Sequence, residues 1–129
     1  MKIEINLNYL ASLYDYLYFM DDEEIMNFHI NSENDQNILF SRMRELYQSF
    51  GNQTQNNILN AMSYLLINHN YLDFWRYVVP HDIPLEDVED KERYLKSMYS
   101  NLFGNINMEL NMNDFDVQNN EILTSSLKL

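Results

Sequence analysis

Carboxylates are the chemically active groups that this sequence supplies in excess. It holds 20 aspartates and glutamates against 8 lysines and arginines, which gives a formal net charge of −12 at pH 7. Residues 21–24 (DDEE) and 86–90 (EDVED) form two dense runs. Paired carboxylates can act as general acid and base when burial shifts the pKa of one of them. Both runs stand at expected helix starts beside polar residues, a pattern typical of helix capping and of a solvated face.

The other residues that could carry chemistry form no catalytic or metal-binding motif. The 3 histidines are scattered, and His69 with Asp73 supplies too few ligands for a zinc site. No nucleophile elbow is present, and Gly51 and Gly104 are too few for a phosphate-binding loop. Residues 111–121 are rich in oxygen ligands but lack the central glycine of a calcium loop. The sequence therefore predicts no enzyme activity, no cofactor and no metal.

The acidic runs are instead candidates for contact with another protein. Tyr16, Tyr18 and Phe19 precede the first run, and Tyr94 follows the second. At interfaces tyrosine side chains supply much of the binding energy, while charged rims steer association. Tyr16 is the preferred interface tyrosine because its position is off the expected leucine face of its helix. The predicted partner-binding residues are Tyr16, Asp21, Asp22, Glu23, Glu24, Glu86, Asp87, Glu89 and Asp90.

Composition places the chain among single-domain globular proteins. Its 129 residues fit one domain, residues 1–129, and 46% of them are apolar. The absence of cysteine excludes disulfides and thiolate metal sites. The N-terminus shows no secretory signal, and no apolar run is long enough to span a membrane, so we expect a cytoplasmic protein. The excess of acid disfavours direct binding to nucleic acid or to an anionic membrane surface.

The apolar spacing predicts a mainly α fold, an irregular bundle of five to seven helices, and allows a small two-stranded β element from the termini. A first helix with Leu10, Leu13 and Leu17 on its apolar face is expected to end near Met20. Further helices are expected at residues 23–30, 35–50, 54–68, 71–79 and 85–103. Alternating apolar residues predict strands at 1–7 and 106–112, and Asp114 or Asp116 is expected to cap a last helix.

The most continuously apolar stretch is residues 58–79, which includes Trp75, the single tryptophan. We expect it to form the core scaffold, with the break at residues 68–70 folding two helices into a hairpin. Trp75 is expected to anchor the core, or an interface if it is exposed. Gly51 is expected to end the preceding helix with a positive φ.

Size and charge favour a small acidic non-enzymatic inhibitor that neutralises a basic protein partner. An acidic domain can block the basic cleft of a nuclease by charge and shape, and electrostatic steering speeds its capture. Bacterial immunity proteins against nuclease-type toxins are of this type, and this is the function we expect. Two alternatives stay open: a phage-encoded inhibitor of a host nucleic-acid enzyme, and a helical adaptor or structural interaction domain.

Overall fold

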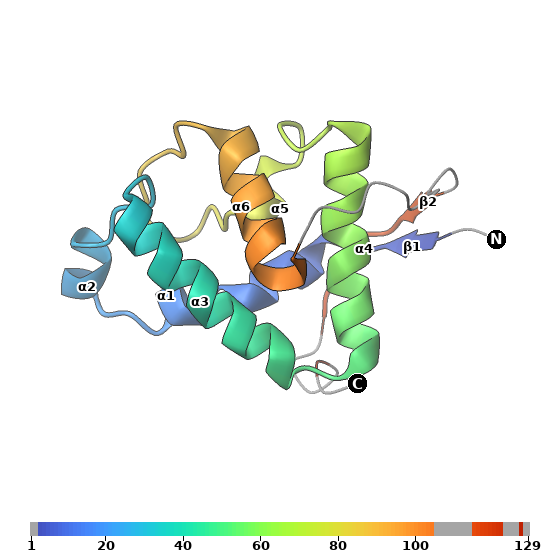
Figure 1. Ribbon diagram of the computed structural model, residues 1–129, viewed down its shortest axis with the longest axis horizontal. Coiled ribbons are helices and arrows are strands. Elements are labelled where there is room, and N and C mark those ends of the chain that lie inside the picture. The colour runs from blue at the N-terminus through green and yellow to red at the C-terminus, as the bar shows by residue number, and fades with distance from the viewer. Residues whose placement is uncertain (1–2, 105–114, 123–126, 128–129) are drawn as a thin grey trace.

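The computed structural model describes residues 3–104, 115–122 and 127, and it confirms the mainly α fold. In this part of the chain, seven helices surround one core and a two-stranded parallel sheet joins segments near the two termini (Figure 1). The elements are β1 (Ile3–Ile5), the 3-10 helix η1 (Leu7–Leu13), α1 (Asp15–Tyr18), α2 (Asp22–Met26), α3 (Glu33–Ser49), α4 (Asn52–Asn68), α5 (Trp75–Val78), α6 (Lys91–Phe103) and β2 (Phe115–Val117).

The central element is η1, against which α3, α4 and α5 all pack. Leu7, Leu10 and Leu13 are fully buried. A 3-10 helix has about three residues per turn, so leucines three positions apart stack on one face. The Asn6 side chain accepts a hydrogen bond from the Asn8 amide, at 3.1 Å, and caps the helix. The single α-helix expected here is therefore wrong: a 3-10 helix and the one-turn α1 divide the segment.

Of the expected core scaffold, residues 58–79, only the part within α4 forms the predicted helix. Helix α4 buries a broad apolar face in the core, and it ends at Asn68 as expected. His69 then adopts a left-handed conformation, with φ 54°, and residues 71–74 form turns rather than a helix. The expected helical hairpin is wrong, because α5 is one turn long and both α4 and α5 pack on η1.

Trp75 is half-buried and packs against the core. The Trp75 ring meets the Tyr94 ring edge-on, with 5.9 Å between the two centroids. Lys91 Nζ lies 5.6 Å from the centroid of the Trp75 ring.

Several helix boundaries differ from the predicted ones because specific caps decide them. Ser32 accepts a bond from the Asp35 amide and starts α3 earlier than expected. Gly51 has a φ of −68° and precedes α4 as its N-cap, so the expected positive φ is wrong. Asp90 starts α6 at Lys91, which leaves residues 85–90 in a loop and corrects the expected start near residue 85. Gly104 ends α6 with a φ of 82°.

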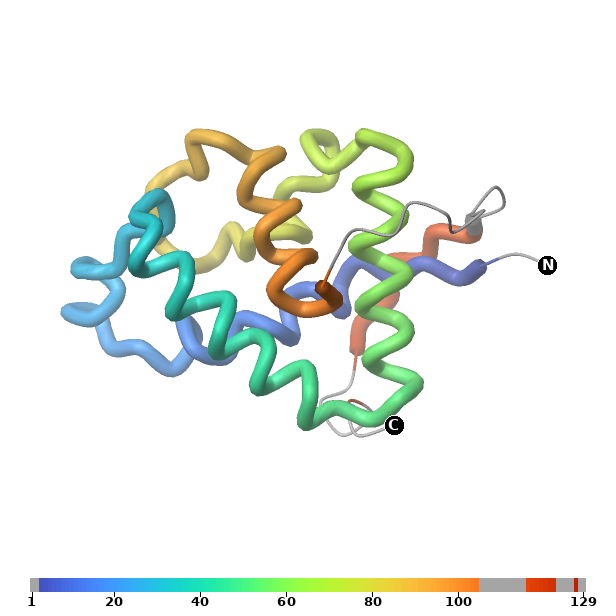
Figure 2. The backbone as a smooth tube through the Cα atoms, viewed as in Figure 1, coloured from blue at the N-terminus to red at the C-terminus, as the bar shows by residue number. Residues whose placement is uncertain are grey.

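The sheet pairs β1 with β2 in parallel, with Ile5 opposite Val117, so that residues 3–5 and 115–117 lie side by side (Figure 2). Asp116 lies within β2 and does not cap a helix, and residues 118–122 are not helical, which corrects the expected last helix. The expected strand at 106–112 and the cap at Asp114 lie outside the described residues. Asn119 Oδ1 accepts a bond from the Leu7 amide, at 2.9 Å, and so secures the start of η1.

Candidate functional site

The first acidic run forms a short helix, α2, that projects from one end of the molecule (Figure 1). Asp21 and Glu24 make a capping box. The Glu24 amide donates to Asp21 Oδ1 at 2.8 Å, and the Asp21 amide donates to Glu24 Oε1 at 3.3 Å. No residue of α2 is buried, and Ile25 is the half-buried side chain that holds it against the core. All four carboxylates of residues 21–24 therefore face solvent.

The second acidic run lies in the loop that leads into α6. Val88 is buried and anchors this loop to the core, whereas Glu86, Asp87 and Glu89 are exposed. Asp90 caps α6 by accepting a bond from the Arg93 amide, at 3.1 Å. The loop thus holds three carboxylates outside the helix in which they were expected.

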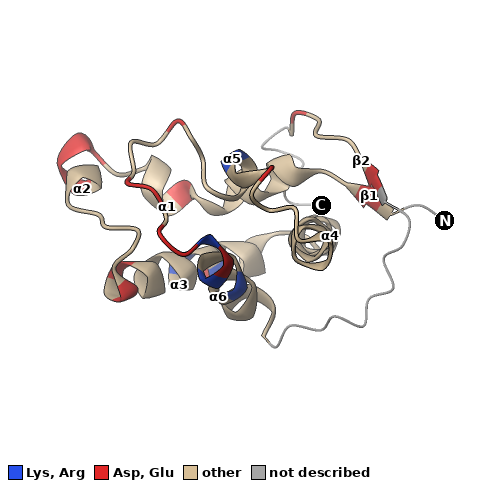
Figure 3. Ribbon diagram, turned by 90° about the horizontal axis from the view of Figure 1, so that it is seen from above, with Lys and Arg blue, Asp and Glu red and all other residues tan. Residues whose placement is uncertain are grey.

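Asn31 follows α2 in the chain and binds the second acidic run. Its backbone amide donates to Glu86 Oε1 at 3.3 Å, its Nδ2 donates to the Asp87 carbonyl at 2.7 Å, and its Oδ1 accepts from the Glu89 amide at 2.9 Å. His29 Nδ1 lies 4.0 Å from Glu86 Oε1. Figure 3 shows acidic residues along α2, at the start of α3 and along the loop into α6.

We call the carboxylates of residues 21–24 and 86–90 the acidic end. Figure 3 shows α2 and the loop into α6, which carry these residues, on the side of the molecule away from the sheet.

Helix capping accounts for only part of the acidic end. Asp21, Glu24 and Asp90 cap helices, and Glu86 accepts a bond from Asn31. The other carboxylates, those of Asp22, Glu23, Asp87 and Glu89, make no side-chain hydrogen bond or ion pair within the described residues. In that part of the chain no lysine or arginine forms an ion pair with any carboxylate of the acidic end. The carboxylates of the acidic end thus have no lysine or arginine ion-pair partner there, and Lys91 Nζ donates to the Val88 carbonyl, at 3.0 Å, within the second run.

Tyr16, the predicted interface tyrosine, is half-buried and packs against the core. The Arg42 guanidinium of α3 lies 5.8 Å from the centroid of its ring. No hydrogen bond or ring contact among the described residues joins Tyr16 to the acidic end. The contacts of Tyr16 are therefore with the core and with Arg42.

Two exposed apolar residues, Phe19 and Met26, are absent from the predicted partner-binding residues, although the sequence placed Phe19 among the aromatics beside the first acidic run. Phe19 is 84% exposed and Met26 is 79% exposed, on either side of the acidic run. Tyr18 is also exposed, and its hydroxyl donates to Asp82 Oδ1 at 3.0 Å. Partial burial and this hydrogen bond raise the pKa of Tyr18 to about 12. Phe19 is separated from the run only by Met20, whereas nothing local distinguishes an exposed methionine such as Met26 from a core one.

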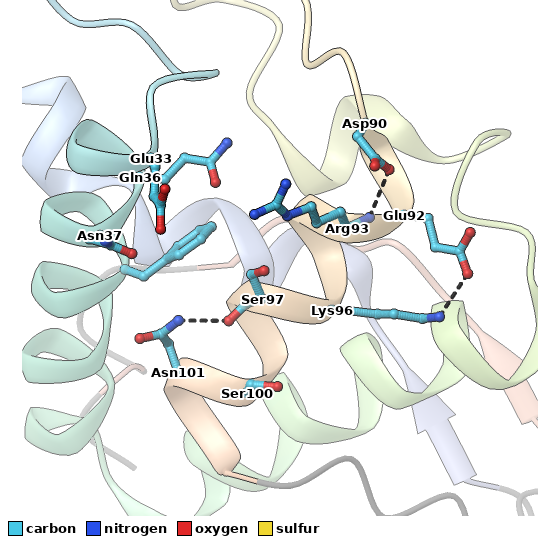
Figure 4. Close-up of a pocket in the computed structure, with 11 residues that line it drawn as sticks. Glu33, Gln36, Asn37, Asp90, Glu92, Arg93, Lys96, Ser97, Ser100 and Asn101 are labelled. Carbon is cyan, nitrogen blue, oxygen red and sulfur yellow. Dashed lines mark hydrogen bonds and ion pairs between the residues drawn. The ribbon is translucent and has the colours of Figure 1, made fainter.

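A polar groove of about 620 Å³ runs between α3 and α6 beside the acidic end (Figure 4). Arg93 reaches across it from α6 toward Glu33 and Gln36 on α3. Lys96 Nζ pairs with Glu92 Oε1 at 2.7 Å. The groove therefore mixes both signs of charge and is a weaker cation site than the acidic end.

Catalytic and metal-binding arrangements are absent from the described part of the chain. Ser97 and Ser100 line the groove, but no histidine is among the residues that line it with them. His69 and Asp73 do not share a helix, since α4 ends at Asn68, before both of them. No group of three or more described histidines, aspartates or glutamates could hold a metal ion. No described helix is both long enough and apolar enough to cross a membrane.

No family model, curated protein or solved structure matches the chain. A functional argument for this protein therefore starts from the acidic end and its surroundings.

Proposed function

We propose that this protein is a small, acidic, non-enzymatic inhibitor that binds a basic protein through its acidic end. The observation that carries the proposal is the set of three hydrogen bonds by which Asn31, in the segment after α2, holds the second acidic run, 55 to 58 positions further along the chain. The carboxylates that make no side-chain hydrogen bond or ion pair within the described residues, such as those of Asp22 and Asp87, give the acidic end an electrostatic field that attracts cations.

The partner that fits best is a nuclease, and the role is that of an immunity protein against a nuclease-type bacterial toxin. Enzymes that act on nucleic acids bind phosphates with clustered lysines and arginines, so their clefts are strongly basic. An acidic protein seated on such a cleft replaces the phosphates and excludes the substrate. Steering of this kind raises association rates by roughly 10- to 1,000-fold, which suits an inhibitor that must act before its target does damage.

The test is capture of the partner by a variant with a reversed charge and by a matched control. Asp22→Lys with Glu23→Lys reverses charge on α2 and leaves the capping box of Asp21 and Glu24 intact. Glu4→Lys with Glu121→Lys changes the net charge by the same amount on exposed residues of the sheet region, and β1 lies at the opposite end from α2 (Figure 1).

The immobilised wild type and the sheet control are expected to capture the same basic protein from host extract, and the α2 variant is expected to lose it. The captured protein is then purified and assayed for nuclease activity with and without the inhibitor. An acidic partner, a partner without activity on nucleic acid, or equal capture by the α2 variant would contradict the proposal.

A further inference from the structure

The two most exposed large apolar side chains in the described chain are those of Phe19, just before α2, and Met26, the last residue of α2. Single exposed apolar residues are ordinary, and Leu72 on a distant loop is one, at 64% exposure. Phe19 and Met26 exceed it, and both belong to the segment that carries the first acidic run. Neither contributes to the core, which is reached from this segment by Ile25 and Phe28.

Helical geometry places Met26 beside the two carboxylates of α2 that do not cap the helix, those of Asp22 and Glu23. Residues three and four positions apart share a face of an α-helix. Asp22 and Glu23 precede Met26 by these intervals, so the thioether stands on the same face as the two carboxylates that do not cap α2. This face therefore combines an adaptable apolar side chain with negative charge, and the exposed Phe19 ring stands just before the helix.

We propose that Phe19 and Met26 form the apolar anchor of the partner-binding surface. This inference rests on the proposed function. Its occupant is a cationic amphipathic segment of the partner, in which apolar side chains are flanked by lysine or arginine. The charge and the apolar residues of this segment together select the occupant. A neutral apolar segment would desolvate Asp22 and Glu23 without supplying a counter-charge. A purely polar cationic segment would leave Phe19 and Met26 in water. Anchors of this kind carry most of the binding energy when charged residues surround them.

The test uses two synthetic peptides of equal length and equal positive charge. One carries lysines and leucines at helical spacing, and the other carries serine in place of each leucine. Binding of fluorescently labelled peptide to the full chain is measured by anisotropy. Wild type is expected to bind the leucine peptide at least about tenfold more tightly than the serine peptide.

Variants then locate the apolar contact. Phe19→Ser with Met26→Ser is expected to abolish the preference for leucine, and Leu72→Ser, an equally polar change on another exposed residue, is expected to preserve it. Phe19→Ser alone lies outside α2 and is expected to reduce the preference even if the double variant alters the helix. A preference that persists in both variants would overturn the inference.

The same titrations distinguish this inference from the proposed function. If Asp22→Lys with Glu23→Lys weakens both peptides but Phe19 and Met26 do not matter, the charged surface stands and the apolar anchor fails. If those charge reversals weaken neither peptide, or if wild type binds neither, the acidic surface fails and the anchor fails with it.

Discussion

Replacing Tyr14 by phenylalanine removes one oxygen atom from the centre of the core. Tyr14 is fully buried at the end of η1. Its hydroxyl donates to the carbonyl oxygen of Val78, the last residue of α5, and lies 2.9 Å from the hydroxyl of Tyr94 on α6. A carbonyl oxygen can only accept, so the Tyr14 proton goes to Val78 and Tyr94 donates to Tyr14. This chain of two bonds links η1, α5 and α6, and the acidic loop connects the last two.

The magnitude follows from the number of groups left without a partner. Tyr14→Phe leaves both the Val78 carbonyl and the Tyr94 hydroxyl without a hydrogen-bond partner. Each buried group without its partner costs about 1–3 kcal/mol, so we expect a loss of about 2–6 kcal/mol. Tyr94→Phe leaves the bond between Tyr14 and Val78 intact and removes one bond, so we expect a loss of about 1 kcal/mol.

Urea unfolding followed by circular dichroism measures both losses at neutral pH. The double variant closes the cycle, and its loss should be smaller than the sum of the two single losses because both substitutions remove the same bond. Equal losses for the two single variants, or a larger loss for Tyr94→Phe, would refute the donor assignment.

Three further predictions concern the same architecture. Burial raises the pKa of the Tyr14 and Tyr94 hydroxyls above 10.0. Their contribution to stability is therefore complete below about pH 10 and is lost as pH rises toward the folded pKa, by about 1.4 kcal/mol per pH unit for each tyrosine. Urea unfolding between about pH 8 and about pH 11 measures this loss, and the free energy of unfolding should decline less steeply with pH in Tyr94→Phe than in the wild type. Asn31→Ala removes two side-chain bonds to the acidic loop. It should lower stability by about 1–2 kcal/mol and speed hydrogen exchange at the Glu89 amide. Asp21→Ala removes the cap of α2 and should speed exchange of the Glu24 amide, while Asp22→Ala leaves that exchange unchanged.

The long helices could be predicted from the sequence because local signals agree there. In α4 the apolar stripe and the break at Asn68 mark the same boundary, and Gly104 ends α6 where it was expected. η1 was mistaken for part of an α-helix. Leu10 and Leu13 are three positions apart, which suits either kind of helix, and the further step of four to Leu17 suggested one continuous α-helix. The start of α6 was misplaced because acids in a first turn and acids in a loop before an Asp90 cap form the same pattern.

The candidate site was predicted in its residues but not in its arrangement. Both acidic runs were recognised from composition alone. The position of the second run depends on Asn31, whose partners are 55 to 58 positions away, and no local pattern records such bonds. The exposure of Phe19 and Met26 was equally hidden, because apolar residues at helical spacing are normally core residues. Tyr16 was chosen instead, and α3 covers part of it through Arg42.

The salt dependence of the association rate tests the central claim most directly. Stopped-flow mixing with the purified partner, from roughly 0.02 M to roughly 0.5 M NaCl, spans weak to strong screening of surface charge. We predict that the wild-type rate falls at least about tenfold over this range, and that Asp22→Lys with Glu23→Lys is slower at low salt with a shallower dependence. The sheet control should follow the wild type. A wild-type rate insensitive to salt, or an α2 variant that follows the wild type, would contradict the role assigned to the acidic end.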